Sequence, residues 1–133
     1  MVFGPQLWHA TRRAFFIMAA ANKSFEPGQF SVAYVTVPNE ETGKKLAKGL
    51  VELKLAACVN ILPKVTSIFE WERKIEEDTE SMLIIKTRTS RVDEISEYMR
   101  KHHPYDVAEV IAMKIENGNE PYMKWMSEII QNE

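Results

Sequence analysis

Apolar residues in this chain recur with strand spacing in some stretches and helix spacing in others, and the pattern predicts seven elements. Residues 30–37 are apolar in both alternating sets, which is typical of a central strand covered on both faces. Three leucines between residues 46 and 53 then recur at helical spacing and predict a helix over residues 39–54. Asn39 is a favourable N-cap because its side chain can accept a hydrogen bond from a free amide of the first turn.

The segment from Ala56 to Arg88 predicts a long β-hairpin, because its two halves are rich in β-branched and apolar residues. The charged stretch 72–80 between them belongs either in an exposed loop or at the solvated far ends of two strands. Pro63 cannot donate a hydrogen bond to a neighbouring strand, so it marks a sheet edge, a bulge or the end of a strand, and we expect a bend there. Beyond that bend the hairpin continues as a protruding arm, with Phe69 and Trp71 on one face near its tip.

The pattern Ser90-x-x-Asp93 predicts a capping box at the start of a second helix, which ends at His102 after two further cations. Residues 106–115 then predict a strand with one apolar face, which Glu109 interrupts. A carboxylate at this position is unusual, since a buried charge needs a partner.

A last helix is expected after the Asn117-Gly118 turn, with Asn119 as its N-cap. The order is β-α-β-β-α-β-α, and its first six elements match the ferredoxin-like arrangement of an α+β fold. This fold has an antiparallel sheet with two helices on one face. The other face needs cover, so the open sheet face, the arm and the last helix are candidate subunit contacts.

The composition is that of one globular domain, with 133 residues of which 45% are hydrophobic and 27% charged. The formal net charge of −2 lacks the basic excess of a nucleic-acid-binding protein. The single cysteine, Cys58, rules out an intrachain disulfide and a metal cage made only of cysteines. No apolar run approaches the ~20 residues that span a bilayer. We therefore expect no nucleic-acid partner and no transmembrane segment, and nothing indicates an organic cofactor.

Residues 1–28 differ from the rest, and we place the domain at residues 29–133. Arg12 and Arg13 precede an eight-residue apolar run that ends in small residues. Within residues 1–22 this pattern resembles a short secretory or mitochondrial leader. The alternative is a disordered extension on a cytoplasmic protein, and cytoplasmic is the location that we expect.

Three groups of short motifs follow one another between residues 30 and 130. They are Lys54–Asn60 with Ile61–Pro63; Ser67–Trp71 with Lys74–Glu76 and Ile85–Thr87; and His103–Tyr105 with Glu109–Ile111, Gly118 and Tyr122–Trp125. Together they resemble the CutA family of divalent-cation tolerance proteins. The resemblance implies a ferredoxin-like fold, a homotrimer built by edge-to-edge strand pairing, and a shape similar to the trimeric PII signalling proteins.

The resemblance implies a function without catalysis. Bacterial members of the family are linked to copper tolerance and reported to bind divalent copper, and mammalian members are linked to the processing and membrane anchoring of acetylcholinesterase. We therefore expect a non-enzymatic homotrimer that binds copper(II) or another divalent cation. The alternatives are a trimeric scaffold for protein partners, including the anchoring or maturation of a membrane enzyme, and a PII-like sensor of small molecules.

His102, His103 and Cys58 are the candidate metal ligands. The adjacent imidazoles match the histidine pair that is proposed to bind copper in the family, and imidazole suits divalent copper. Alternatively, the histidines form the cationic end of a helix, and Cys58 is a small buried hydrophobe. Some bacterial members place a Cys ligand at the position of Val35, and Val cannot bind a metal.

A cleft between subunits is the second candidate site, and we assign Tyr105, Glu109, Trp71 and Lys86 to it. Glu109 gives the reason, since a carboxylate on an apolar strand face either lines a cleft or is satisfied by a cation or a tyrosine hydroxyl.

Three aromatic residues, Phe69, Trp71 and Trp125, are predicted at the trimer interface, where aromatic side chains are enriched. With Tyr122, the two tryptophans could instead form an aromatic ligand box or part of the core.

Overall fold

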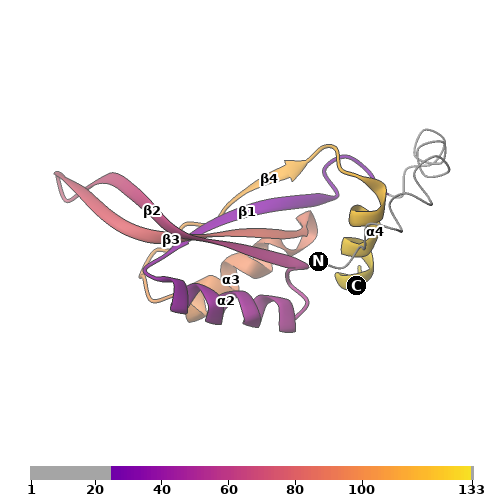
Figure 1. Ribbon diagram of the computed structural model, residues 1–133, viewed down its shortest axis with the longest axis horizontal. Helices are drawn as coiled ribbons and strands as arrows, with labels where there is room; N and C mark the ends of the chain where they lie inside the picture. The colour runs from indigo at the N-terminus through magenta and orange to yellow at the C-terminus, as the bar shows by residue number, and fades with distance from the viewer. Residues whose placement is uncertain (1–24, 133) are drawn as a thin grey trace.

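The structure is a computed structural model that describes residues 25–132, so the predicted leader at residues 1–22 lies outside the described residues. Its elements are β1 (Phe30–Val37), α2 (Glu40–Glu52), β2 (Cys58–Trp71), β3 (Lys74–Arg88), the 3-10 turn η1 (Thr89–Arg91), α3 (Val92–His102), β4 (Ile111–Ile115) and α4 (Glu120–Ile129). The strands form one antiparallel sheet in the order β2-β3-β1-β4. α2 and α3 lie on one face of it (Figure 1), and the predicted α+β fold is confirmed.

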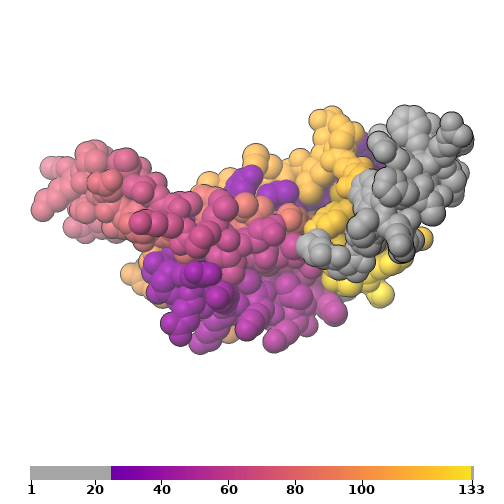
Figure 2. Space-filling view, viewed as in Figure 1, coloured from indigo at the N-terminus to yellow at the C-terminus, as the bar shows by residue number. Residues whose placement is uncertain are grey.

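The long hairpin of β2 and β3 extends beyond the body of the domain as an arm (Figures 1 and 2). Its turn consists of Glu72 and Arg73, with φ of 50° and 66°, and a tight two-residue hairpin turn requires such positive values. The charged stretch 72–80 is therefore mostly strand rather than loop. This outcome confirms the second of the two alternatives, in which the charges lie at the solvated ends of strands.

The predicted irregularity at Pro63 is confirmed, because the register of β2 against β3 shifts between Leu62 and Val65. The Ser81 hydroxyl donates a hydrogen bond of 2.8 Å to the Pro63 carbonyl and holds this site to the neighbouring strand. A bulge of this kind increases the local twist and redirects a strand. It marks the point where the arm leaves the body.

The core on the helix side contains alternate residues of β1 and β3, with Val35, Leu83 and Ile85 fully buried against α2 and α3. In α2, the Asn39 side chain accepts a hydrogen bond of 2.8 Å from the Thr42 amide, which confirms the predicted cap. The predicted leucine stripe is wrong at its last position. α2 ends at Glu52, and Leu53, the C-cap residue, is 60% exposed.

Two predicted boundaries around α3 differ from the structure. The predicted capping box is wrong, because η1 precedes α3. In the part of the chain that the structure describes, the side chains at the two N-cap positions, Arg88 and Arg91, make no capping hydrogen bond. Thr89, the first residue of η1, is bonded to the two residues before β1: its amide donates to the Gln29 carbonyl and its hydroxyl to the Gly28 carbonyl.

The last strand is shorter than the predicted 106–115, because β4 pairs with β1 only from Ile111 onward. Further along β1, the Thr36 carbonyl bonds to the His103 ring at 2.8 Å. This acceptor is thus used by a side chain, and residues 106–110 run free of the sheet.

α4 packs at one end of the molecule over a second cluster that includes Phe30, Met126 and Ile130. Phe25 is 5% exposed in this cluster, so the packed region begins before residue 29. Arg88 holds the helix end, since its guanidinium donates to the Ile130 and Ser127 carbonyls and lies 5.1 Å above the Phe30 ring. Burial, followed by the charge of Arg91, lowers the pKa of Arg88.

The sheet face opposite the helices is partly uncovered within the chain. Ile111 is 55% and Met113 53% exposed on β4, and Leu62 is 44% exposed on β2. β2 and β4 are also the two edges of the sheet, each paired on one side only. Among residues 25–132, none of the helices is long and apolar enough to cross a membrane.

Candidate functional site

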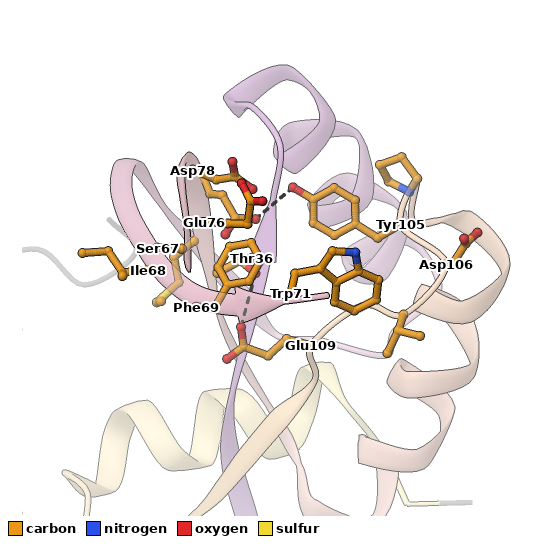
Figure 3. Close-up of a pocket in the computed structure, with 14 residues that line it drawn as sticks. Thr36, Ser67, Ile68, Phe69, Trp71, Glu76, Asp78, Tyr105, Asp106 and Glu109 are labelled. Atoms are coloured by element: carbon orange, nitrogen blue, oxygen red, sulfur yellow. Dashed lines mark hydrogen bonds between the residues drawn. The ribbon is translucent and has the colours of Figure 1, made fainter. Parts of the chain in front are cut away.

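A groove of about 970 Å³ lies between the arm and the segment that follows α3 (Figure 3). Its charged and aromatic lining comes from three places in the chain. These residues are Phe69 and Trp71 of β2; Glu76, Asp78 and Glu80 of β3; and Tyr105, Asp106 and Glu109 of the segment after α3.

The hairpin register brings the arm residues of the groove to one face. Phe69 pairs with Glu76, and Trp71 lies two residues further along β2. Because alternate residues of a strand point to the same side, both rings and the Glu76 carboxylate face the groove. Phe69 is 40% and Trp71 62% exposed, so a bound molecule can reach both rings.

Glu80 and Tyr105 join the arm to the loop. The Tyr105 hydroxyl donates a hydrogen bond of 2.9 Å to Glu80 Oε2, and Glu80 is only 7% exposed. Burial raises the pKa of Tyr105 to about 12, and the bond to Glu80 and the charges of Glu80 and Asp78 act in the same direction. Tyr105 is therefore a neutral donor at physiological pH, and it leaves the negative charge of Glu80 uncompensated.

Glu109 lies on the segment that does not join β4. Its Oε2 accepts a hydrogen bond of 3.2 Å from the Thr36 hydroxyl, and the side chain is exposed. Glu109 thus lines the groove and also has a hydroxyl partner, which here is a threonine rather than a tyrosine.

The fourth residue assigned to the cleft between subunits, Lys86, does not line this groove of the single chain. Lys86 pairs with Cys58 in the hairpin register, on the body of the sheet. Its ammonium donates to Asn60 Oδ1 and lies 3.9 Å from Cys58 Sγ.

His103 is a structural residue in this chain. It is 7% exposed, and its backbone is extended, with φ −76° and ψ 140°, as expected before a proline. The Tyr105 amide donates to Nδ1 at 3.1 Å, so Nε2 carries the proton and donates to the Thr36 carbonyl. Both ring nitrogens are engaged within the fold.

His102 has a different environment. It is exposed at the end of α3, and its ring lies 4.5 Å from the Tyr98 ring. Within residues 25–132 its ring nitrogens form no hydrogen bond. The two adjacent histidines therefore do not share one open site.

Cys58 is not close to the histidines. Its neighbour Val59 packs against the helix-side core, so Cys58 faces the open side of the sheet, at the level of Val32 on β1. His103 contacts β1 at Thr36, four residues away, or roughly 13 Å at the rise of a strand. Val35 is fully buried in the core. Residues 25–132 contain no group of three or more His, Cys, Asp or Glu that could hold a metal ion.

Trp125 is half-buried in the α4 cluster, and its ring centroid lies 5.3 Å from that of Tyr122. The Tyr122 hydroxyl is buried beside the Cys58 thiol, and within residues 25–132 it makes no hydrogen bond of good geometry. Burial, followed by the neighbouring Cys58, raises the pKa of Tyr122 to about 12. Neither residue lines the groove, so Trp71 and Trp125 do not form one aromatic box within the chain.

Sequence reasoning missed the acidic side of the groove. It treated Glu76, Asp78 and Glu80 as part of a solvated hairpin end. The signal was present, because these residues alternate along β3 and share one face of a strand. Finding it required the position of the turn at residues 72 and 73, which fixes the pairing of Glu76 with Phe69.

A family model described as CutA1 divalent ion tolerance protein matches residues 31–129. The chain is 56% identical over 110 residues to the CutA homolog of Xenopus laevis, covering 83% of this chain and 73% of that protein. It is 46% identical over 112 residues to human CutA, covering 84% of this chain and 63% of that protein, so it spans less than two thirds of the human protein. A relative from Arabidopsis thaliana, 50% identical over 101 residues, covering 76% of this chain and 56% of that protein, is named as chloroplastic.

The solved structures that resemble this chain are of proteins from the same family. CutA1 from Oryza sativa superposes with a TM-score of 0.77 at 46% identity, covering 81% of this chain and 97% of that one. The divalent cation tolerance protein of Thermus thermophilus superposes with a TM-score of 0.74 at 42% identity, covering 77% and 99%. The family match therefore extends through the sheet, the arm and the helices, and this chain belongs to the CutA1 family of divalent ion tolerance proteins.

Proposed function

We propose that this protein is a non-enzymatic homotrimer that binds divalent cations, with copper(II) as the leading ion. Membership of a divalent-ion tolerance family supports the cation. The uncovered sheet face and the two edge strands support the assembly, since a monomer would leave apolar residues and backbone groups open to water. Edge-to-edge contacts between identical chains close into a ring when the rotation permits it.

The observation that carries the assembly is the exposure of apolar residues on both edge strands, Leu62 on β2 and Ile111 and Met113 on β4. Phe69 and Trp71, exposed on the arm, are further candidates for the contact, whereas Trp125 contributes less because half of it is already covered within the chain.

We place copper(II) at His102, because His103 uses both ring nitrogens within the fold. One imidazole makes a weak site, so further ligands have to come from elsewhere in the assembly. Cys58 faces the open side of the sheet and is not one of these ligands within the same chain.

The test is a copper titration of the purified protein against a competing chelator, together with light scattering to measure its mass. We expect a trimer that binds a fixed number of ions per chain, and binding that is lost in His102→Ala. His103→Gln provides the contrast, since it should lower thermal stability and leave an exposed His102. Equal binding by the wild type and His102→Ala would exclude this site, and a monomeric mass would exclude the assembly.

For the compartment we propose the cytoplasm, with the leader at residues 1–22 as the alternative. Fusion of residues 1–28 to a fluorescent protein tests this directly in cells. Diffuse fluorescence supports the proposal, and a secreted or organellar signal would identify a leader.

A further inference from the structure

Lys86 lies on the open face of the sheet, and within residues 25–132 its ammonium group forms no ion pair. We propose that it pairs with Glu109 of the partner subunit, so that each contact between copies joins a cation from one chain to an acid from the next. The inference rests on the homotrimer proposed above and adds the two residues that fix how neighbouring copies meet.

The surroundings of Lys86 are apolar. Its neighbour Ile85 is fully buried in the helix-side core, so Lys86 points to the opposite face of the sheet. In the strand register it lies between Val32 of β1 and Cys58 of β2. Its ammonium group donates to Asn60 Oδ1 and lies 3.9 Å from Cys58 Sγ, and neither partner is a carboxylate. When a second copy covers this face, the ammonium group loses water, and a buried charge without a counter-charge is strongly unfavourable.

The Lys86 side chain extends toward an edge of the sheet that a second copy can join. Its acceptor Asn60 belongs to β2, which is paired on one side only. The other unpaired edge is β4. A contact between identical chains closes into a ring when one edge of each copy meets the other edge of the next. The counter-charge of Lys86 is therefore expected at the β4 edge of the neighbouring copy.

Glu109 is the acid at the β4 edge, two residues before that strand begins. Its carboxylate accepts a hydrogen bond from the Thr36 hydroxyl, and Thr36 alternates with Val35 of the helix-side core. This bond holds Glu109 on the open face, where its side chain is exposed. Glu109 lines the groove described above, whose fourteen residues include four further carboxylates and no Lys, Arg or His. This part of the single chain thus lacks a cation.

The two charges are too far apart to meet within one chain. Lys86 is level with Val32 of β1, whereas Glu109 binds Thr36, four residues further along the same strand. At the rise of a strand this distance is roughly 13 Å. Glu80 shares the open face of β3 with Lys86 but is six residues away, or roughly 20 Å. A second copy can bring a carboxylate of this face to Lys86.

The two edges of the sheet are complementary in charge. The cation lies beside the β2 edge and the acid beside the β4 edge, so contact between unlike edges joins opposite charges. Contact between two like edges would instead oppose two cations or two acids, which is unfavourable. The ion pair therefore favours the ring of identical contacts over a symmetric pair of chains.

The test is sedimentation of the full-length protein over a range of concentrations, in the urea concentration that half dissociates the wild-type trimer. Lys86→Glu opposes two acids at each contact and should raise the concentration needed for assembly by at least roughly 30-fold, as expected for a broken buried pair. Glu109→Lys should have a similar effect. The double variant Lys86→Glu/Glu109→Lys exchanges the charges and should recover most of the loss. Lys48→Glu, an equal change of charge on the exposed face of α2, is the matched control and should assemble like the wild type.

Three results would overturn the ion pair and leave the homotrimer standing. Unchanged assembly in either single variant would mean that the altered residue has no charged partner in the contact. A double variant no better than the single ones would mean that the two residues do not face each other. Equal weakening by Lys48→Glu would mean that net charge alone controls assembly. A wild type that is monomeric without urea would overturn the homotrimer and the ion pair together.

Discussion

The body and the arm of this domain share the two strands β2 and β3, yet apolar side chains are buried in the body and exposed on the arm. In the body, Leu83 and Ile85 of β3 are fully buried beneath the helices. Beyond the bulge at Pro63, Ile68 of β2 is 69% exposed and Ile75 of β3 is 74% exposed. Burial of apolar residues in the body therefore stabilises the single chain. The apolar residues of the arm contribute to stability only when another molecule covers them.

Truncation of one apolar residue in each region gives the largest expected contrast. Leu83→Ala leaves a cavity in a packed core and should lower the free energy of unfolding by about 2–5 kcal/mol. Ile75→Ala should change it by less than about 0.5 kcal/mol, because the side chain is already in water. Urea denaturation of both variants measures the difference. A comparable loss in Ile75→Ala would place the arm in a subunit contact and sharpen the proposal of a trimer.

The attachment of α4 to the body depends on the guanidinium group of Arg88. Arg88→Met removes the hydrogen bonds to the Ile130 and Ser127 carbonyls, and each bond to a charged group contributes about 1.5–3 kcal/mol. We expect a loss of roughly 3 kcal/mol and early exchange of the α4 amides with deuterium. Arg100→Met is the matched control. It breaks a surface pair with Glu97, and this change should leave stability almost unaltered because both side chains are exposed to solvent. Slow α4 exchange in Arg88→Met would mean that packing alone holds the helix.

The contrast between body and arm also explains what the sequence could and could not predict. Strand β1, the Asn39 cap and the bulge at Pro63 follow from local rules of spacing, capping and hydrogen bonding, and all three are confirmed. The end of the last strand does not follow from local rules. Residues 106–110 have a strand-like pattern, but the His103 ring binds the Thr36 carbonyl on β1.

The candidate site shows the same limit. Trp71, Tyr105 and Glu109, which were assigned to a cleft between subunits, line one groove within the single chain. Lys86 does not line that groove, since its place depends on the register of β3 against β2. The position of the hairpin turn sets this register. The sequence pattern does not show where the turn lies within the charged stretch. The His103 ring likewise bonds to the Thr36 carbonyl, which is far away in the sequence, and this contact separates it from its neighbour His102.

A smaller effect is expected inside the body at Gly49 of α2. A methyl group there would overlap the Tyr98 hydroxyl and lie 3.0 Å from its Cζ atom. Alanine is the better helix former by about 1 kcal/mol, so an isolated helix would gain from the change. We expect the displacement of Tyr98 to outweigh that gain, with a net loss of about 1 kcal/mol in thermal denaturation, within the usual range for such strain. Gly49→Ala in a Tyr98→Phe background, which removes the hydroxyl, should recover most of it.

The junction of arm and body gives the smallest and most local prediction. The raised pKa of Tyr105, about 12 in the fold against 10 in a free chain, means that the folded state disfavours the phenolate. The contribution to stability is fully present below pH 10 and is lost as the pH rises through 12. Absorbance titration of tyrosinate should show two groups with a pKa near 12, Tyr105 and Tyr122. Only the pKa of Tyr105 should move toward 10 in Glu80→Gln, although burial will keep part of the shift. Asp93→Asn, an exposed acid on α3 away from the groove, should leave the curve unchanged. An unchanged curve in Glu80→Gln would instead place the cause in burial alone, and the arm and the loop would then be joined by packing rather than by this hydrogen bond.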